Sequence, residues 1–265
     1  TFDEVTQVVD ELYDELSVSA FRPKFCELEF SAHGALPGVA FSGERCRGVV
    51  EGFVDRVDVW QSGGRPYVRV VDYKTGKKSF DYTNVLHGRG LQMLLYLFAL
   101  VRQGGHLLHG EPLPAGVLYF PARIERVSVR DRLAQAEIEK ERRKQLRRSG
   151  VLLNSDPVLE AMEPCGGSPR FLPYTLDKEG RKTGDLASFV QLAQLERFVF
   201  QTVAALGDEL ADGRIDPDPC IRDAKDSACA FCPYSEVCAG HEQPRWLKKI
   251  TAEEFWQTLE RREHG

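Results

Sequence analysis

The fold is decided by residues 49–76, which read VVEGFVDRVDVWQSGGRPYVRVVDYKTG. Two valine-rich runs flank the Gly63-Gly64 pair, and this pattern predicts a β-hairpin closed by a two-residue turn. A turn centred on these glycines places Asp55 opposite Asp72, because the two residues are equally far from it in sequence. Side chains of a strand alternate between faces with a period of two, so Lys74 is expected on the same face as Asp72.

This face predicts a metal site. Opposed residues of an antiparallel pair have their Cβ atoms about 5 Å apart, and like charges in such positions are destabilising unless a cation lies between them. Mg²⁺ takes oxygen ligands at roughly 2.0–2.1 Å and keeps waters for chemistry. Asp55, Asp72 and Lys74 therefore match the ligand set of a metal-dependent nuclease. In the alternative interpretation, Lys74 alone neutralises two structural carboxylates.

The residues before Asp72 favour the functional interpretation. Val68, Val70 and Val71 bring this carboxylate in on a largely apolar strand, where an unpaired charge is costly. A carboxylate that is buried beside a lysine is a perturbed cluster of the kind that gathers at functional sites.

The composition describes an ordinary globular protein, with 42% hydrophobic and 28% charged residues in a chain of 265. The longest apolar run, residues 91–101, falls far short of the roughly 20 residues that span a bilayer. No membrane partner and no signal peptide are expected, which favours a cytoplasmic location. The net charge of −5 argues against gripping nucleic acid by bulk electrostatics. The chain lacks an initiator methionine, so we expect it to be a segment of a longer protein.

Hydrophobic periodicity predicts the other elements and an α/β or α+β core. Helices are expected at 3–17, 91–103, 131–148 and 186–212, and strands at 24–31 and 117–120.

The 91–103 helix is apolar nearly all round, which indicates burial. Gln92 and Tyr96 are its only polar groups near the start, and their spacing places them on one face. Either they are ordinary structural residues, or they point at the carboxylate cluster and hold a DNA phosphate or a catalytic water. The charged helix at 131–148 interleaves glutamates with its lysines and arginines, which favours a solvated face over a DNA-backbone contact.

The C-terminal region carries a thiolate metal motif. Cys229, Cys232 and Cys238 crowd into ten residues, and such spacing in a reduced compartment indicates zinc or an iron–sulfur cluster. Three cysteines leave one ligand missing. His241, Cys220 or a residue preceding Thr1 would complete the set.

Taken in order, these motifs resemble a known family. Three segments look like the successive nuclease motifs of the RecB-like branch of the PD-(D/E)XK superfamily: Gly52-Phe-Val-Asp55-Arg-Val-Asp58, Val71-Asp72-Tyr73-Lys74-Thr-Gly76 and Leu91-Gln92-Met-Leu-Leu-Tyr96. Three more are similar to the B subunits of AddAB-type helicase–nucleases: Gly150-Val-Leu-Leu-Asn-Ser-Asp156, Phe171-Leu-Pro-Tyr-Thr-Leu and Ala-Cys229-Ala-Phe-Cys232-Pro-Tyr-Ser-Glu-Val-Cys238.

The resemblance implies a mixed sheet flanked by helices and a role for each site residue. Asp55, Asp72 and the Tyr73 carbonyl would bind Mg²⁺, with Mn²⁺ as a possible substitute, and Lys74 would orient the attacking water. Gln92 and Tyr96 would lie near the DNA.

The family also binds a cluster through its cysteines. By the resemblance, Cys229, Cys232 and Cys238 would hold a 4Fe–4S cluster, with zinc less favoured. In this family a metal-binding histidine and the first cluster cysteine precede these motifs, and we expect both upstream of Thr1.

The resemblance further implies DNA and an AddA-like helicase–nuclease subunit as partners. The expected activity is cleavage of the 5′-ended strand during double-strand break repair by homologous recombination. We expect a nuclease core at 1–215 and a Cys-rich iron–sulfur segment with a C-terminal helix, packed on the core, at 216–265. The alternatives are a CRISPR-associated (Cas4-like) exonuclease and a non-catalytic DNA-end-binding iron–sulfur or zinc module.

Overall fold

The structure is a computed structural model that describes residues 2–76, 79–123, 135–223, 226–230, 232–238 and 244–264. The helices are α1 (Phe2–Val18), α2 (Tyr82–Leu86), α3 (Gln92–Gln103), α4 (Gly105–Leu108), α5 (Gln135–Leu146), α6 (Asp156–Met162), α7 (Phe189–Ala211) and α8 (Ala252–His264). The strands of the main sheet are β1 (Arg22–Phe30), β4 (Gly52–Ser62), β5 (Arg65–Lys74), β6 (Leu113–Pro121), β7 (Ser149–Leu153) and β10 (Leu186–Ala187). Short strands outside it are β2 (Val39–Ser42), β3 (Arg47–Val50), β8 (Tyr174–Leu176), β9 (Lys182–Gly184), β11 (Cys220–Ile221) and β12 (Arg245–Trp246).

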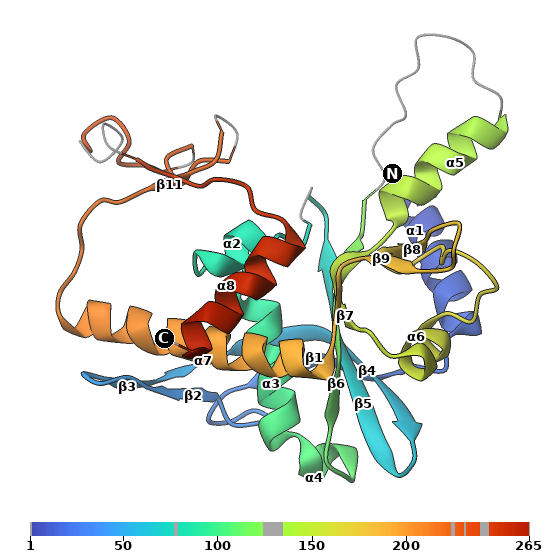
Figure 1. The fold of residues 1–265 in the computed structure, drawn as a ribbon, viewed down its shortest axis with the longest axis horizontal. Helices are drawn as coiled ribbons and strands as arrows, with labels where there is room; N and C mark the ends of the chain where they lie inside the picture. The colour runs from blue at the N-terminus through green and yellow to red at the C-terminus, as the bar shows by residue number, and fades with distance from the viewer. Residues whose placement is uncertain are drawn as a thin grey trace. The chain divides into compact units, whose positions relative to one another are not determined.

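The core is a six-stranded mixed sheet in the order β1-β4-β5-β6-β7-β10. The β5/β6 and β7/β10 pairs are parallel, and the other neighbours are antiparallel. Parallel neighbours need a crossover connection, and α3 lies in the connection between β5 and β6. The expected α/β class with a central mixed sheet flanked by helices is confirmed (Figure 1).

The predicted hairpin and its register are confirmed. Gly63 and Gly64 form the turn, with φ values of 57° and 77° that suit glycine. The ladder pairs Ser62 with Arg65 at the turn and Arg56 with Val71 at the far end. One further step along this register places Asp55 opposite Asp72.

Helices cover both faces of the sheet, as the edge-on view of Figure 1 shows for α1 on one side and α3 on the other. Residues Met93 to Leu100 of α3 are all buried, and this helix packs on β5 and β6. The helix expected at 91–103 is therefore buried, as predicted. The helices expected at 3–17 and 186–212 and the strands expected at 24–31 and 117–120 are also present. Residues 131–134 of the expected charged helix lie outside the described residues.

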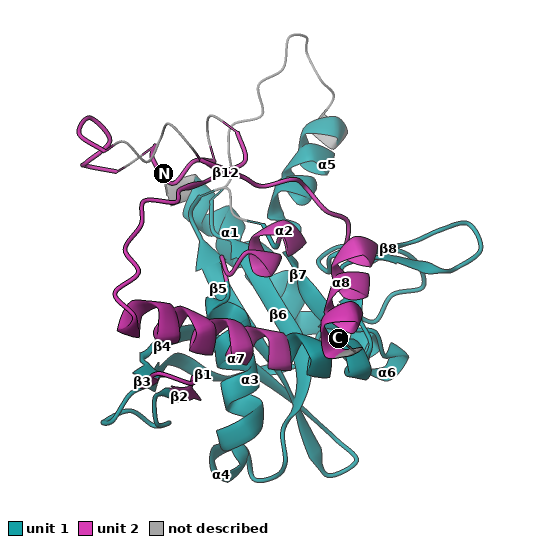
Figure 2. Ribbon diagram, turned by 60° about the vertical axis from the view of Figure 1, so that its left-hand side comes forward, with its two compact units in different colours: residues 1–39, 49–80, 91–196 teal, residues 40–48, 81–90, 197–265 magenta. Residues whose placement is uncertain are grey.

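The chain divides into two compact units, coloured separately in Figure 2. Unit 1 comprises residues 1–39, 49–80 and 91–196 and holds the main sheet. Unit 2 comprises residues 40–48, 81–90 and 197–265 and holds the cysteine-rich segment. The domain boundary after residue 215 stays a prediction. None of the described helices has the combination of length and hydrophobicity that a membrane-spanning segment requires.

Candidate active site

The hairpin brings the predicted carboxylates together at the end of the β4–β5 ladder that lies away from the Gly63-Gly64 turn. Asp55 accepts a hydrogen bond from the backbone N–H of Tyr73, with 2.8 Å between Oδ2 and N. This bond fixes the Asp55 carboxylate beside the residue that follows Asp72. The predicted proximity of the two carboxylates therefore has a direct structural cause in the β4–β5 ladder.

Lys74 forms an ion pair with Asp72 through Nζ and Oδ2. The side chain of Asp72 is 11% exposed and that of Lys74 is 27% exposed. A lysine two residues along the strand thus points to the same face, as its spacing predicts. The pair is shielded from bulk water but remains reachable from the surface. Such a site strengthens electrostatic interactions without closing off a substrate.

Tyr119 is a neighbour of this cluster that the sequence analysis missed. It stands beside Asp72 in the parallel β5/β6 ladder, and paired residues share a face. Burial, together with the charge of Asp72, raises the pKa of Tyr119 to about 12. Its hydroxyl is therefore protonated at neutral pH and can donate a hydrogen bond. Tyrosine at the centre of an apolar strand is a common core residue, so no sequence signal pointed to this placement.

The two polar residues of α3 have different environments. Gln92 is exposed at the start of the helix, whereas Tyr96 is buried. The Tyr96 ring stacks on Phe30 with 5.1 Å between ring centroids. Its hydroxyl lies against Gly52, where any Cβ atom would collide with it. The predicted contact of both residues with DNA remains a prediction, and the close approach explains why glycine begins the Gly-x-x-Asp motif.

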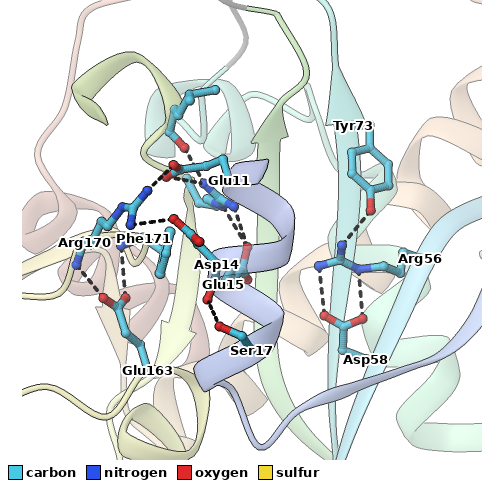
Figure 3. A network of polar contacts seen from close by, with 12 residues as sticks. Glu11, Asp14, Glu15, Ser17, Arg56, Asp58, Tyr73, Glu163, Arg170 and Phe171 are labelled. Atoms are coloured by element: carbon cyan, nitrogen blue, oxygen red, sulfur yellow. Dashed lines mark hydrogen bonds and ion pairs between the residues drawn. The ribbon is translucent and has the colours of Figure 1, made fainter. Parts of the chain in front are cut away.

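The opposite face of the same hairpin carries a second charged cluster, shown in part in Figure 3. Asp58 pairs with Arg69 at 2.8 Å between Oδ2 and Nε, and both side chains are fully buried. Arg69 also bonds Glu15 of α1 at 3.0 Å, and Arg148 bonds the same glutamate. This cluster joins α1 to the sheet. Unlike Asp72 and Lys74, its members are closed to solvent.

The hairpin face that carries Asp55, Asp72 and Lys74 is called the open face below. Its oxygen donors fit a hard divalent cation. Asp55 and Asp72 supply carboxylate oxygens, and the carbonyl of Tyr73 is a further oxygen on the same short segment. Mg²⁺ is commonly bound by one or two carboxylates, with waters and substrate phosphates filling the other positions. Within the described residues, no group of three or more His, Cys, Asp or Glu side chains is arranged to hold a metal ion. The metal prediction therefore rests on this small oxygen set.

The cysteine segment belongs to unit 2. Cys229, Cys232 and Cys238 are half-buried cysteines in a run of turns, and Cys232 donates its N–H to the Cys229 carbonyl at 3.1 Å. Soft thiolates suit zinc or iron–sulfur chemistry. The N–H of Ala228 donates to the carbonyl of Cys220 at 3.2 Å, so the backbone of Cys220 adjoins this segment and Cys220 stays a candidate fourth ligand. The alternative ligand at residue 241 lies outside the described residues.

The charged helix α5 pairs its own ions. Arg143 contacts Glu139 at 3.2 Å, and Lys144 contacts Glu141. All four side chains are about half exposed. These pairs on one helix agree with the solvated face that the interleaved glutamates predict.

Comparison with known families agrees with this site. A model of the PD-(D/E)XK nuclease superfamily matches residues 3–239. Because this match covers most of the sequence, the chain belongs to the PD-(D/E)XK nuclease superfamily. The confirmed hairpin and mixed sheet are the parts of the fold that carry the site.

The chain is also similar to curated proteins that are named as the B subunit of an ATP-dependent helicase/deoxyribonuclease. It is 35% identical to the protein of Moorella thermoacetica over 237 residues, which are 88% of this chain and 20% of the relative. It is 30% identical to that of Clostridium kluyveri over 253 residues, 91% of this chain and 22% of the relative. The chain thus spans about a fifth of the length of the curated relatives it matches.

Proposed function

We propose that this chain is the nuclease domain of an AddB-like helicase–nuclease subunit and hydrolyses DNA phosphodiester bonds with Mg²⁺ or Mn²⁺. The observation that carries the proposal is the open-face cluster. The Asp55 carboxylate is held by the Tyr73 amide, and Asp72 is paired with Lys74, in a chain of this nuclease superfamily.

Each residue has a defined task in this reaction. Asp55, Asp72 and the Tyr73 carbonyl bind the cation, which supplies Lewis acidity and a nucleophilic water when bound. The Lys74 ammonium lies beside Asp72, where it orients the attacking water and stabilises the charge that develops on the phosphate. Gln92, exposed at the start of α3, contacts the DNA strand near the carboxylates, and the buried Tyr96 supports this helix against Gly52 at the start of the motif.

The substrate and partners follow from the relatives' names and the resemblance. The DNA strand reaches the site from the motor of an AddA-like partner, in the cytoplasm, and the 5′-ended strand is cut. The experiment uses the full-length protein with its partner and linear DNA labelled at either the 5′ or the 3′ end. Mg²⁺-dependent shortening of the 5′-ended strand supports the proposal, and Asp72→Asn is expected to abolish it. DNA binding by wild type with no shortening of the 5′-ended strand would instead indicate an end-binding module.

We also propose that Cys229, Cys232 and Cys238 hold three corners of a 4Fe–4S cluster in unit 2. The support is the spacing of three cysteines in one turn-rich segment. Analysis of the purified protein for iron, acid-labile sulfide and zinc tests this proposal. Iron and sulfide in equal amounts support it, whereas zinc without iron indicates a structural zinc site.

A further inference from the structure

Tyr73 connects the two faces of the hairpin. Its backbone N–H donates to Asp55 on the open face, while its side chain lies on the opposite face. There its hydroxyl accepts a hydrogen bond from Arg56, with 2.6 Å between Nη1 and the oxygen. The ring also packs against Phe120, with 5.2 Å between centroids. Tyr73, the residue between Asp72 and Lys74, is therefore held in place by contacts on the opposite face of the hairpin.

Arg56 is itself held in place, as Figure 3 shows for its contacts with Asp58 and Tyr73. Its Nε lies 2.8 Å from Asp58 Oδ1, and its Nη2 donates to Oδ2 at 3.0 Å. Asp58 is in turn bound by the fully buried Arg69. A planar guanidinium that uses two nitrogens on one carboxylate has little freedom. Its remaining nitrogen is thus presented to Tyr73 in a fixed direction.

We propose that Arg56 is a positioning residue for the cation site: through the Tyr73 hydroxyl it fixes the strand segment that carries Asp72, Tyr73 and Lys74. The inference rests on the proposed function, because it assigns a purpose to a contact behind the predicted ligands. Partners of metal ligands that never touch the ion still set ligand orientation and affinity. An unanchored Tyr73 would let the end of β5 move, and with it the amide that holds Asp55.

The test measures Mn²⁺ binding by the full-length protein without DNA, so its readout does not depend on turnover. The site is defined as the Mn²⁺ binding that Asp72→Asn removes. Tyr73→Phe deletes only the hydroxyl and keeps the ring. We expect it to weaken this binding roughly 10-fold. Tyr67→Phe is the matched control, because Tyr67 lies on the same face of β5 as Tyr73. Its ring also packs against an aromatic residue, Trp60, with 5.4 Å between ring centroids. This control is expected to bind Mn²⁺ within about twofold of wild type, since its hydroxyl is remote from the ligands.

A double-mutant cycle shows whether Arg56 acts through this hydroxyl. Arg56→Lys keeps the charge but lacks the fork that serves Asp58 and Tyr73 together. We expect it to weaken Mn²⁺ binding in the wild-type background and to add little to Tyr73→Phe, because both changes break one connection.

The outcomes separate this inference from the proposed function. Unchanged Mn²⁺ binding in Tyr73→Phe, or fully additive effects in the cycle, would overturn the positioning role while Asp72→Asn still lost binding. If Asp72→Asn left Mn²⁺ binding equal to that of wild type, the proposed cation site would be wrong, and the inference would be wrong with it.

Discussion

The two faces of the β4–β5 hairpin carry similar charged residues that have different roles. On the α1 face, Asp58 and Arg69 are fully buried and bonded to further charged groups. On the other face, the Asp72 and Lys74 side chains remain 11% and 27% exposed at the end of a strand. Ions that are buried and paired with one another hold elements together, whereas ions at an open edge remain available to a ligand. Exposure, more than residue type, separates structure from chemistry here.

The largest stability effect is expected on the closed face. Arg69→Met removes the cation that lies between Asp58 and Glu15, so each of these buried carboxylates loses one of its two arginine partners. We expect a loss of about 3–5 kcal/mol in the free energy of unfolding, measured by urea denaturation. Arg65→Met is the control on the same strand. Arg65 pairs with Glu111, and their side chains are 52% and 88% exposed. Such exposed pairs contribute about 0–1 kcal/mol to the free energy of unfolding. Equal losses in both variants would refute the distinction between the faces.

Acid should weaken the same cluster through Glu15. Burial alone would raise the pKa of Glu15, but the charges of Arg148, Arg69 and Arg56 outweigh burial and hold it below its ordinary value of 4.5. A carboxyl whose pKa is lowered by folding stabilises the fold above the unfolded pKa, and this contribution is lost as the pH falls through the folded pKa.

Glu15→Gln is therefore expected to destabilise the protein at neutral pH by roughly 1.5–3 kcal/mol. It should also flatten the fall in stability below about pH 4.5. Thermal unfolding at a series of pH values measures both effects. Glu111→Gln, at an 88% exposed side chain, is the control with little expected change. If stability fell as steeply at acidic pH in Glu15→Gln as in wild type, this account would be contradicted.

The smallest effect is expected at Gly52, where β4 begins against Tyr96 of α3. An added methyl group would collide with the Tyr96 hydroxyl, so Gly52→Ala should cost about 1–3 kcal/mol by overpacking. Tyr96→Phe in the same chain should recover part of this loss, because it removes the colliding oxygen. Gly166→Ala, which meets open space, is the control. No recovery in the double variant would show that the strain has another source.

The sequence predicts one face of the hairpin better than the other. The Gly63-Gly64 turn fixes the register, so the proximity of Asp55 and Asp72 follows from local rules. The same register contains the Asp58–Arg69 pairing on the other face. In contrast, the bond between Glu15 and Arg148 joins residues 133 positions apart. Such a contact depends on how α1 packs, which local periodicity cannot specify.

Tyr119 illustrates the same limit. Its place beside Asp72 depends on the register of the parallel β5/β6 pair, and these two strands are joined by a long connection that contains α3. A tight turn specifies its strands, whereas a crossover leaves the alignment to tertiary packing.

Lys74→Ala tests the central claim most directly. The full-length protein with its partner would be assayed on end-labelled linear DNA in Mg²⁺ and in Mn²⁺, and its thermal unfolding would be measured in parallel. Lys24→Ala, at an exposed lysine on β1, serves as the control. The account predicts a loss of about 10²–10³-fold in cleavage of the 5′-ended strand in Lys74→Ala, with an unfolding temperature close to that of wild type. Metal-dependent cleavage of the 5′-ended strand that is unchanged in Lys74→Ala would contradict it.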